Sequence, residues 1–370
     1  MVVVVFFTGS QGLKGGTERA CADTASTLSD LGYPVTILSQ YGGRVSHYEV
    51  SEPVILDELS CERRRGVVGY LSSSWLLLRY VIKTRPHAVV AVESISFLFL
   101  IPLLLLSSRP VLVNWEHFNA NVDLGVKARN YSRKLAARFA DKIVVLSQRD
   151  VQIWKRKFPS SENKLEVIYN INPFSGLGNN DAKKKASRCG LKRVVSAGRL
   201  THQKGFDLLL QAWAKIDHPV RDGWELVILG EGEDRESLEH AISSHSLDNV
   251  FLPGQSDQIE DDFFASDIFV LPSRFEGFGL VVLEALSCGL PVVSFDCDAG
   301  PAEIVEDAVN GLIVPAGNVD ELSVALASLM SSDEVREEMS KASHVSVSKF
   351  DDEEISKRWV KLFRGLGVNA

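Results

Sequence analysis

The residues with the clearest potential for chemistry are two glutamates eight positions apart, Glu276 and Glu284, with a glycine-rich turn between them. The apolar run Ile268–Leu271 before them is typical of a strand buried on both faces. From Leu280 onward apolar residues recur at helical spacing until Gly289. A strand, a glycine turn and a helix start form an anion site, because the first-turn amides are unpaired and the helix dipole favours negative charge. Carboxylates repel phosphates, so we expect the glutamates to accept hydrogen bonds from hydroxyl groups on either side of the anion, on a sugar and on a ribose.

A second loop supplies the positive charge that such an anion requires. Arg199 and Lys204 lie in residues 196–205, between a predicted strand and a predicted helix. Two positive side chains beside a helix terminus would offset the charge of a diphosphate. The two stretches together therefore predict a site for a diphosphate that is flanked by hydroxyl-bearing groups.

These stretches closely resemble the family 4 retaining glycosyltransferases of GT-B fold. The resemblance is carried by Gly198-Arg199, Lys204-Gly205 and Glu276-Gly-Phe-Gly-Leu with Glu284. It continues through Gly289-Leu-Pro-Val-Val, Glu303-Ile-Val and Asn310-Gly-Leu-Ile-Val-Pro. It covers residues 194–330 strongly and the N-terminal half more weakly. Two N-terminal segments are similar to those of transferases for bacterial surface polysaccharides: Gly15-Gly-Thr-Glu-Arg19 and Trp115-Glu-His-Phe-Asn119.

The resemblance implies an α/β protein of GT-B fold, with two Rossmann-like parallel-sheet domains facing a central cleft. Residues 1–172, with a C-terminal helix at about 351–370, would form the acceptor-binding domain, and residues 173–350 the nucleotide-sugar donor domain. A chain of 370 residues is long enough for two domains. Its second half alternates predicted strands and helices, as parallel sheets do. Residues 170–181 are rich in Gly, Asn and Pro, which is typical of a linker.

The resemblance also implies a role for each site residue. Arg199 and Lys204 would stabilise the diphosphate charge as the bond to the anomeric carbon breaks. Glu276 would bind the sugar hydroxyls, Glu284 the ribose, the 254–255 loop the base, and the amides of residues 278–280 a phosphate. The predicted catalytic residues are His117, Arg199, Lys204 and Glu276. The predicted substrate-binding residues are Gly15, Gly16, Gly254, Gln255, Phe278, Gly279, Leu280 and Glu284.

The N-terminal members of this set also have structural interpretations. The glycine-rich loop after the first predicted strand is neither a Walker loop nor a GxGxxG turn. In the resembling family its Gly15-Gly16 pair faces the diphosphate; the alternative is an ordinary glycine turn. His117 follows the predicted strand Val111–Trp115, at the edge where open α/β sheets place ligands. In relatives such a histidine contacts the donor sugar or positions the acceptor; the alternative is a structural histidine.

We expect neither a metal ion nor a cofactor. Asp296-Cys-Asp298 matches the D-x-D pattern that holds a divalent cation in another glycosyltransferase fold, but Arg199 and Lys204 already supply positive charge. The five cysteines are odd in number, show no CxxC spacing and lie amid predicted core elements, which indicates reduced thiols in a cytosolic protein. Residues 2–7 are apolar without a basic region or cleavage site, so we interpret them as a first strand rather than a signal peptide.

Charge is unevenly divided along the chain. The composition is that of a soluble globular protein, with 45% hydrophobic and 24% charged residues and a net charge of −8. Residues 1–172 hold 21 Lys/Arg against 15 Asp/Glu, a balance of +6, and the remainder 19 against 33, a balance of −14. The basic half is where an anionic surface or substrate would dock; the alternative is ordinary variation among solvated faces.

Two stretches of the basic half are strongly apolar. Residues 62–83 combine three arginines with Trp75 and several leucines, and residues 95–106 are a twelve-residue apolar run. A run of twelve is too short for a bilayer span, which needs about 20 residues. Each stretch is either a core helix or, because basic residues lie beside tryptophan and leucine, a membrane-surface helix. Basic residues farther along would extend the positive surface: Lys127, Arg129, Arg133, Lys134, Arg138 and Lys142.

The resemblance, together with these features, implies a metal-independent retaining hexosyltransferase in polysaccharide biosynthesis. The donor would be a nucleotide-diphosphate sugar, with a UDP-sugar favoured by resemblance, and we expect the acceptor to be a lipid-diphosphate-linked saccharide. The protein would be cytoplasmic and peripheral on the inner face of the cell membrane, without a nucleic-acid partner. Two alternatives remain. The first is a GT-B sugar-nucleotide epimerase, which would need acid and base carboxylates but no acceptor. A non-catalytic sugar-nucleotide-binding subunit would keep Lys204 and lose the sugar-side glutamates.

Overall fold

The computed structural model describes residues 3–63, 66–176 and 190–370, which divide into two compact units. Unit 1 comprises Met1–Ile171 and Asp352–Ala370, and unit 2 comprises Asn172–Asp351. The predicted boundaries at 172 and 351 differ from these by one residue. Residues 177–181 of the predicted linker, and Cys189, lie outside the described residues.

Unit 1 is built on a seven-stranded parallel sheet in the order β3-β2-β1-β4-β5-β6-β7. The central strands are buried along their whole length, as expected where helices cover both faces of a parallel sheet. The strands are β1 Val4–Thr8, β2 Val35–Ser39, β3 Ile55–Glu58, β4 Ala88–Val92, β5 Val111–Trp115, β6 Lys142–Val145 and β7 Leu165–Val167. The helices are α1 Gly16–Asp30, α2 Gly66–Thr84, η1 Ser94–Leu105, α3 Lys127–Phe139, α4 Gln148–Lys157, η2 Pro159–Ser161 and α13 Asp352–Gly365.

Unit 2 contains a six-stranded parallel sheet in the order β10-β9-β8-β11-β12-β13. Its strands are β8 Lys192–Ala197, β9 Trp224–Leu229, β10 Val250–Gly254, β11 Ile268–Leu271, β12 Val292–Asp296 and β13 Gly311–Pro315. Its longer helices are α5 Phe206–Lys215, α7 Arg235–Ser244, α9 Leu280–Ser287, α11 Val319–Ser331 and α12 Asp333–Ser346. Its short helices are η4 His202–Lys204, α6 His218–Arg221, α8 Ile259–Phe264, α10 Pro301–Ile304 and η5 Ser348–Phe350. Counted along the unit, the strand order is the 3-2-1-4-5-6 of a Rossmann fold, which confirms the predicted fold class.

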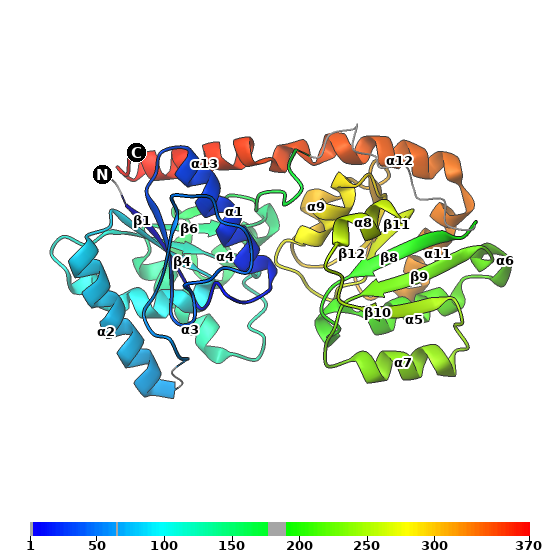
Figure 1. Ribbon diagram of the computed structural model, residues 1–370, viewed down its shortest axis with the longest axis horizontal. Coiled ribbons are helices and arrows are strands. Elements are labelled where there is room, and N and C mark those ends of the chain that lie inside the picture. The colour runs from blue at the N-terminus through cyan, green and yellow to red at the C-terminus, as the bar shows by residue number, and fades with distance from the viewer. Residues whose placement is uncertain (1–2, 64–65, 177–189) are drawn as a thin grey trace. The chain divides into compact units, whose positions relative to one another are not determined.

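The last helix of the chain, α13, belongs to unit 1. Its apolar residues recur at helical spacing, and Trp359 is fully buried. The ring of Trp359 lies 6.0 Å from that of Phe6 in β1 and 5.0 Å from that of Trp115 in β5, in edge-to-face contacts. The helix also packs on α1, beside which it runs in Figure 1. Burial of these aromatic rings joins the C-terminal segment to the core around the first strand.

The two apolar stretches of unit 1 form helices that pack on each other. The first becomes α2 and the second η1, a 3-10 helix that buries Phe97, Leu100 and Leu103 in the core. The helix η1 is thus a core element, whereas α2 is buried on one face and exposed on the other. None of the helices within the described residues combines the length and apolarity needed to cross a bilayer.

One prediction about the surface of unit 1 is wrong. Arg129 and Arg133 of α3 are buried and do not extend the positive surface, because each forms an ion pair with a glutamate. The expectation of core cysteines is also wrong at one position: Cys61 is exposed, whereas the other described cysteines are buried.

Candidate functional site

The topology of the unit 2 sheet brings the two predicted site loops together. The strand order reverses between the neighbouring strands β8 and β11. Open α/β sheets bind ligands at such a point, outside the carboxyl ends of the strands. The loop after β8 carries Arg199 and Lys204, and the loop after β11 carries Glu276. Residues 72 positions apart in the sequence therefore meet at one sheet edge.

Lys204 and Glu276 form a direct ion pair. The Lys204 Nζ donates to Glu276 Oε1 at 2.7 Å, and the hydroxyl of Ser273 donates to the same oxygen at 2.6 Å. Glu276 is only 6% exposed. Because water does not solvate the carboxylate, these two contacts balance its negative charge and hold it in one orientation. The sequence indicated both charged residues but not that they contact each other.

The glycines of the first loop are required by close backbone approach. Gly205 has φ +67°, and a Cβ at this position would lie 2.1 Å from the carbonyl oxygen of Pro272 in the second loop. A Cβ at Gly198 would lie 3.1 Å from Cε of Lys204. The Gly198-Arg199 and Lys204-Gly205 pairs thus let the lysine lie against the strand exit, in reach of Glu276.

An arginine–aspartate pair that sequence reasoning missed also joins the two loops. Arg274 donates through both terminal nitrogens to Asp207, at 2.7 Å each, and through Nη1 to the carbonyl of His202 at 2.8 Å. Hydrogen bonds from Arg274 hold the pKa of Asp207 below its usual range. The side chain of Gln203 adds a bond to the carbonyl of Phe275 at 3.1 Å. The one available sequence signal for this pair was an acidic residue, Asp207, in the first turn of α5, and it did not indicate Arg274 as the partner.

The helix α9 begins directly after the second loop. Gly279 is its N-cap residue, with φ +94°, and offers no side chain to cap the first-turn amides. Phe278 is buried against Phe350, with ring centroids 5.7 Å apart, while Leu280 begins the helix. Glu284 is buried one turn inside α9. The helix start, Lys204 and Glu276 therefore share one loop region, while Arg199 is exposed just after β8.

The remaining predicted donor residues lie farther along the same edge. Gly254 ends β10 with φ +97°, its carbonyl accepts a bond from the amide of Gly230 at 2.8 Å, and Gln255 follows as an exposed residue. The D-x-D pattern lies at the end of β12, where burial raises the pKa of the intervening Cys297 thiol to about 12. Across residues 3–63, 66–176 and 190–370, no cluster of three or more potential metal ligands is present.

The other predicted site residues lie in unit 1. His117 follows β5, packs its ring 4.4 Å from that of Trp115, and is 6% exposed. Burial lowers the pKa of His117 to about 3, so the imidazole is neutral near pH 7. Its Nε2 has no hydrogen-bond partner among the described residues. Gly15 is the extended N-cap residue of α1, and Gly16 is the first residue of that helix.

A buried charge network holds the loop that carries His117. Arg133 donates through Nε to Glu116 at 2.7 Å, with both side chains fully buried, and through Nη1 to the carbonyl of Val122 at 2.9 Å. Asp150 accepts a bond from the amide of Ala120 at 2.8 Å. Burial raises the pKa of Asp150 to about 8. Loop 116–122 is therefore anchored at both sides of the histidine.

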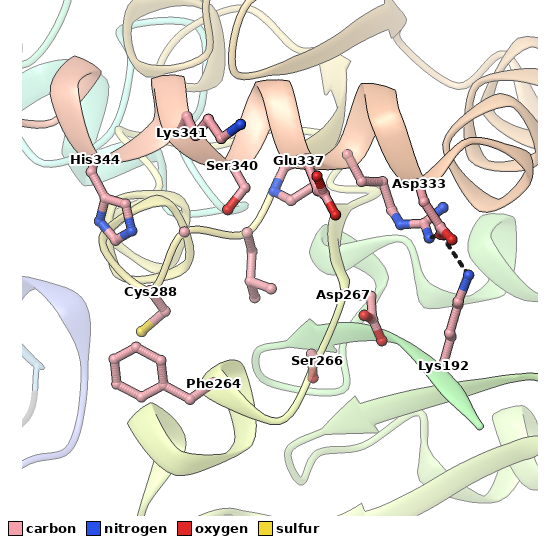
Figure 2. Close-up of a pocket in the computed structure, with 14 residues that line it drawn as sticks. Lys192, Phe264, Ser266, Asp267, Cys288, Asp333, Glu337, Ser340, Lys341 and His344 are labelled. Carbon is pink, nitrogen blue, oxygen red and sulfur yellow. Dashed lines mark hydrogen bonds and ion pairs between the residues drawn. The ribbon is translucent and has the colours of Figure 1, made fainter. Parts of the chain in front are cut away.

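A cavity of about 530 Å³ lies at the other edge of the unit 2 sheet (Figure 2). Residues next to the amino ends of β8, β11 and β12 line it, together with one face of α12. Lys192 and Asp333 form an ion pair of 2.6 Å at one end, and Cys288 and His344 lie at the other. None of its lining residues belongs to the loops described above, so it plays no part in the Lys204–Glu276 site.

Comparison with known proteins identifies the family of the chain. The sequence profile described as Glycosyltransferase Family 4 matches residues 14–171, and the profile described as Glycosyl transferases group 1 matches residues 179–345. An uncharacterized glycosyltransferase of Haemophilus influenzae is 30% identical over 97% of this chain and 99% of its own length. The amylovoran biosynthesis glycosyltransferase AmsD of Erwinia amylovora is 30% identical over 93% of this chain and 95% of its own length.

Solved structures show the same fold. Sucrose-phosphate synthase from Thermosynechococcus elongatus has a TM-score of 0.83 at 19% identity, with 99% of both chains covered. The complex of Anabaena HepE with UDP-glucose has a TM-score of 0.79 at 20% identity, covering 98% of this chain and 99% of that one. With profiles over both halves and near full-length relatives at 30% identity, the chain belongs to the family 4 glycosyltransferases of GT-B fold.

Proposed function

We propose that this protein is a retaining, metal-independent hexosyltransferase that moves a hexose from a UDP-sugar to a lipid-diphosphate-linked saccharide during polysaccharide biosynthesis. The similarity to AmsD, named for amylovoran biosynthesis, supports the pathway class, and that to HepE, solved with UDP-glucose, supports the donor class. A Campylobacter jejuni relative named as a transferase acting on a diphospho-undecaprenol-linked sugar, 28% identical over 61% of this chain, supports the acceptor class.

The observation that carries the proposal is the contact between Lys204 and Glu276 beside the start of α9. A buried carboxylate fixed by a lysine and a serine is a preorganised acceptor for sugar hydroxyls. The lysine and the first-turn amides of α9 provide positive charge within the same loop region. A diphosphate bound at these groups would bring an attached sugar to Glu276 and a ribose to Glu284.

The reaction then follows from charge development in the diphosphate. As the bond between the anomeric carbon and the diphosphate oxygen breaks, the electron pair moves to the leaving group, where Lys204 and Arg199 stabilise it. The acceptor hydroxyl attacks on the face that the diphosphate leaves, and its proton passes to a leaving-group phosphate oxygen. The new glycosidic bond retains the anomeric configuration, and no enzyme nucleophile is needed. These cations and amides supply the charge that a metal ion supplies in other transferases.

His117 acts in this proposal as a neutral hydrogen-bonding group. With a pKa of about 3 it carries no charge near pH 7, so it cannot serve as a cationic acid there. Its unpartnered, buried Nε2 can bind one sugar or acceptor hydroxyl. The network around Glu116 and Arg133 would keep the ring in place for that contact.

The test replaces Lys204 by alanine and compares it with Lys215→Ala. Lys215 lies on α5, is half exposed and forms a surface ion pair with Asp320, so it is a matched control outside the site. We expect Lys204→Ala to lose about 100- to 1,000-fold in transfer rate, as on removing one group that stabilises transition-state charge, and Lys215→Ala to change little. Thermal shift with UDP-, GDP- and ADP-hexoses identifies the donor, and NMR of the product gives its anomeric configuration.

Each outcome decides between functions. Nucleotide release that depends on a lipid-linked acceptor, with retention at the anomeric carbon, supports the proposal. Conversion of the donor sugar without acceptor would instead identify an epimerase. An active Lys204→Ala enzyme would overturn the assigned site.

A further inference from the structure

The helix α2 of unit 1 buries small residues and exposes large apolar ones. Its buried face consists mainly of small side chains: Gly69, Ser73, Ser74, Leu77 and Val81. Its opposite face, here called the outer stripe, consists of Val67 (74% exposed), Val68 (78%), Leu71 (60%), Trp75 (54%) and Ile82 (53%). A surface helix of a soluble protein normally turns its apolar side chains inward. The helix α2 does bury Leu77 and Val81, but it also exposes the five large apolar side chains of the outer stripe, which indicates a surface that is covered in use.

The outer stripe is continuous along the helix. Val67, Leu71 and Trp75 are spaced four residues apart, which places them on one face. From residue 67 to residue 82 the stripe is about 22 Å long at 1.5 Å per residue. Packing on η1 holds α2 from the other side, at the periphery of unit 1 (Figure 1). The stripe is thus a rigid, elongated apolar surface.

The two charged residues of α2 itself are both positive. The guanidinium of Arg79 lies 4.6 Å from the ring centre of Trp75, and Lys83 is exposed in the last turn. Glu62 and Arg63 are both exposed just before the helix and offset each other in charge, and residues 66–84 contain no Asp or Glu. Tryptophan and arginine with an apolar stem suit the boundary between lipid headgroups and acyl chains. Basic side chains beside them attract anionic headgroups.

We propose that the outer stripe of α2 lies on an anionic lipid surface, with the helix parallel to the membrane plane. A second copy of the chain is disfavoured as the occupant, because pairing two such faces would bring positive charges together without an acidic partner. The apolar side chains enter the interface, and Arg79 and Lys83 contact lipid phosphates. This membrane contact rests on the proposed function in one respect: the lipid-linked acceptor would be presented at this surface.

The experiment measures co-sedimentation of the full chain with vesicles of phosphatidylcholine, with and without about one third phosphatidylglycerol. We expect binding to the anionic vesicles that weakens as salt is raised. The double variant Leu71→Gln/Trp75→Gln should lower partitioning about tenfold or more, because two large apolar side chains no longer enter the interface. Arg79→Gln/Lys83→Gln should abolish most of the preference for anionic lipid. Val324→Gln and Val345→Gln, at exposed valines of α11 and α12 in unit 2, are matched controls that should bind as the unaltered protein does.

A separate readout distinguishes this inference from the proposed function. Thermal shift with a UDP-sugar should be the same in all these variants, because α2 and the donor loops belong to different units. If the protein binds vesicles but a UDP-sugar does not raise its melting temperature, the membrane-binding role of α2 is supported and the UDP-sugar donor is rejected. Indifference of the unaltered protein to anionic vesicles, or full binding by the Leu71→Gln/Trp75→Gln variant, would overturn the inference. A dimer in solution that this variant disrupts would assign the stripe to a second copy instead.

Discussion

Replacing Gly205 by alanine tests whether the two loops of unit 2 approach as closely as the structure shows. An alanine there must adopt φ +67°, which costs about 1 kcal/mol relative to glycine. Its Cβ would also lie 2.1 Å from the carbonyl oxygen of Pro272, so the backbone of one loop must move by more than 1 Å to reach ordinary contact. Overpacking of this kind adds about 1–3 kcal/mol. The expected loss in unfolding free energy is therefore about 2–4 kcal/mol.

Gly223 provides the control for the backbone contribution. It has φ +79°, but a Cβ there would meet no atom within 4 Å. Gly223→Ala should therefore cost only about 1 kcal/mol. In thermal unfolding, unit 2 should lose about 4–16 °C with Gly205→Ala and about 2–4 °C with Gly223→Ala, at roughly 2–4 °C per kcal/mol for a unit of this size.

The functional result of Gly205→Ala follows from the same displacement. Movement of the loop separates Lys204 from Glu276, so a UDP-sugar should stabilise the Gly205→Ala protein less than it stabilises the Gly223→Ala protein. Equal melting temperatures and equal nucleotide shifts in the two variants would refute the close approach and the argument for glycine at this position.

Two further predictions concern buried or paired charges. Arg274→Ala should weaken UDP-sugar binding about tenfold, because three hydrogen bonds that join the two loops of unit 2 are lost. The control Arg109→Ala removes a similar two-nitrogen contact with Asp141 in unit 1 and should leave the affinity unchanged. Equal affinities of the two variants would contradict this prediction. Burial raises the pKa of Asp150 to about 8 from 3.8, so the folded protein holds the Asp150 proton more tightly than the unfolded chain does. The resulting contribution to the free energy of unfolding is complete below about pH 4 and is lost as pH rises through 8. Asp150→Asn should remove that part of the pH dependence, on the order of a few kcal/mol between pH 5 and pH 8 in urea unfolding, and an unchanged slope would reject the assignment.

Local sequence patterns were sufficient to predict the strand, turn and helix around Glu276 in unit 2. The apolar run of β11, the glycine turn and the helical spacing of α9 are short-range features, and each agrees with the structure. The strand–helix alternation likewise predicted a parallel sheet in unit 2, since such strands need crossover connections. These features could be read because residues close in sequence determine them.

Contacts between distant residues could not be read in this way. Arg274 and Asp207 lie 67 positions apart, and neither has a local pattern that indicates the other. The basic residues 127–142 were expected on the surface as a group, yet Arg129 and Arg133 are buried against Glu93 and Glu116, which come from the ends of β4 and β5. Nothing in the spacing of residues in α3 showed that two carboxylates lie at that sheet edge.

The two faces of α2 illustrate the same division. Its sequence is apolar nearly all round, which left a core helix and a membrane-surface helix equally open. Burial depends on what the rest of unit 1 places against the helix, and only the face with Gly69, Ser73, Ser74, Leu77 and Val81 is covered. The amino-acid sequence alone thus determined the family, the parallel-sheet class and the charged residues in the loops after β8 and β11, because these follow from residue types and local periodicity. Only the tertiary structure decided that Lys204 contacts Glu276, that two arginines are internal and that α2 exposes the apolar side chains of the outer stripe, because strand order and packing determine which distant residues meet.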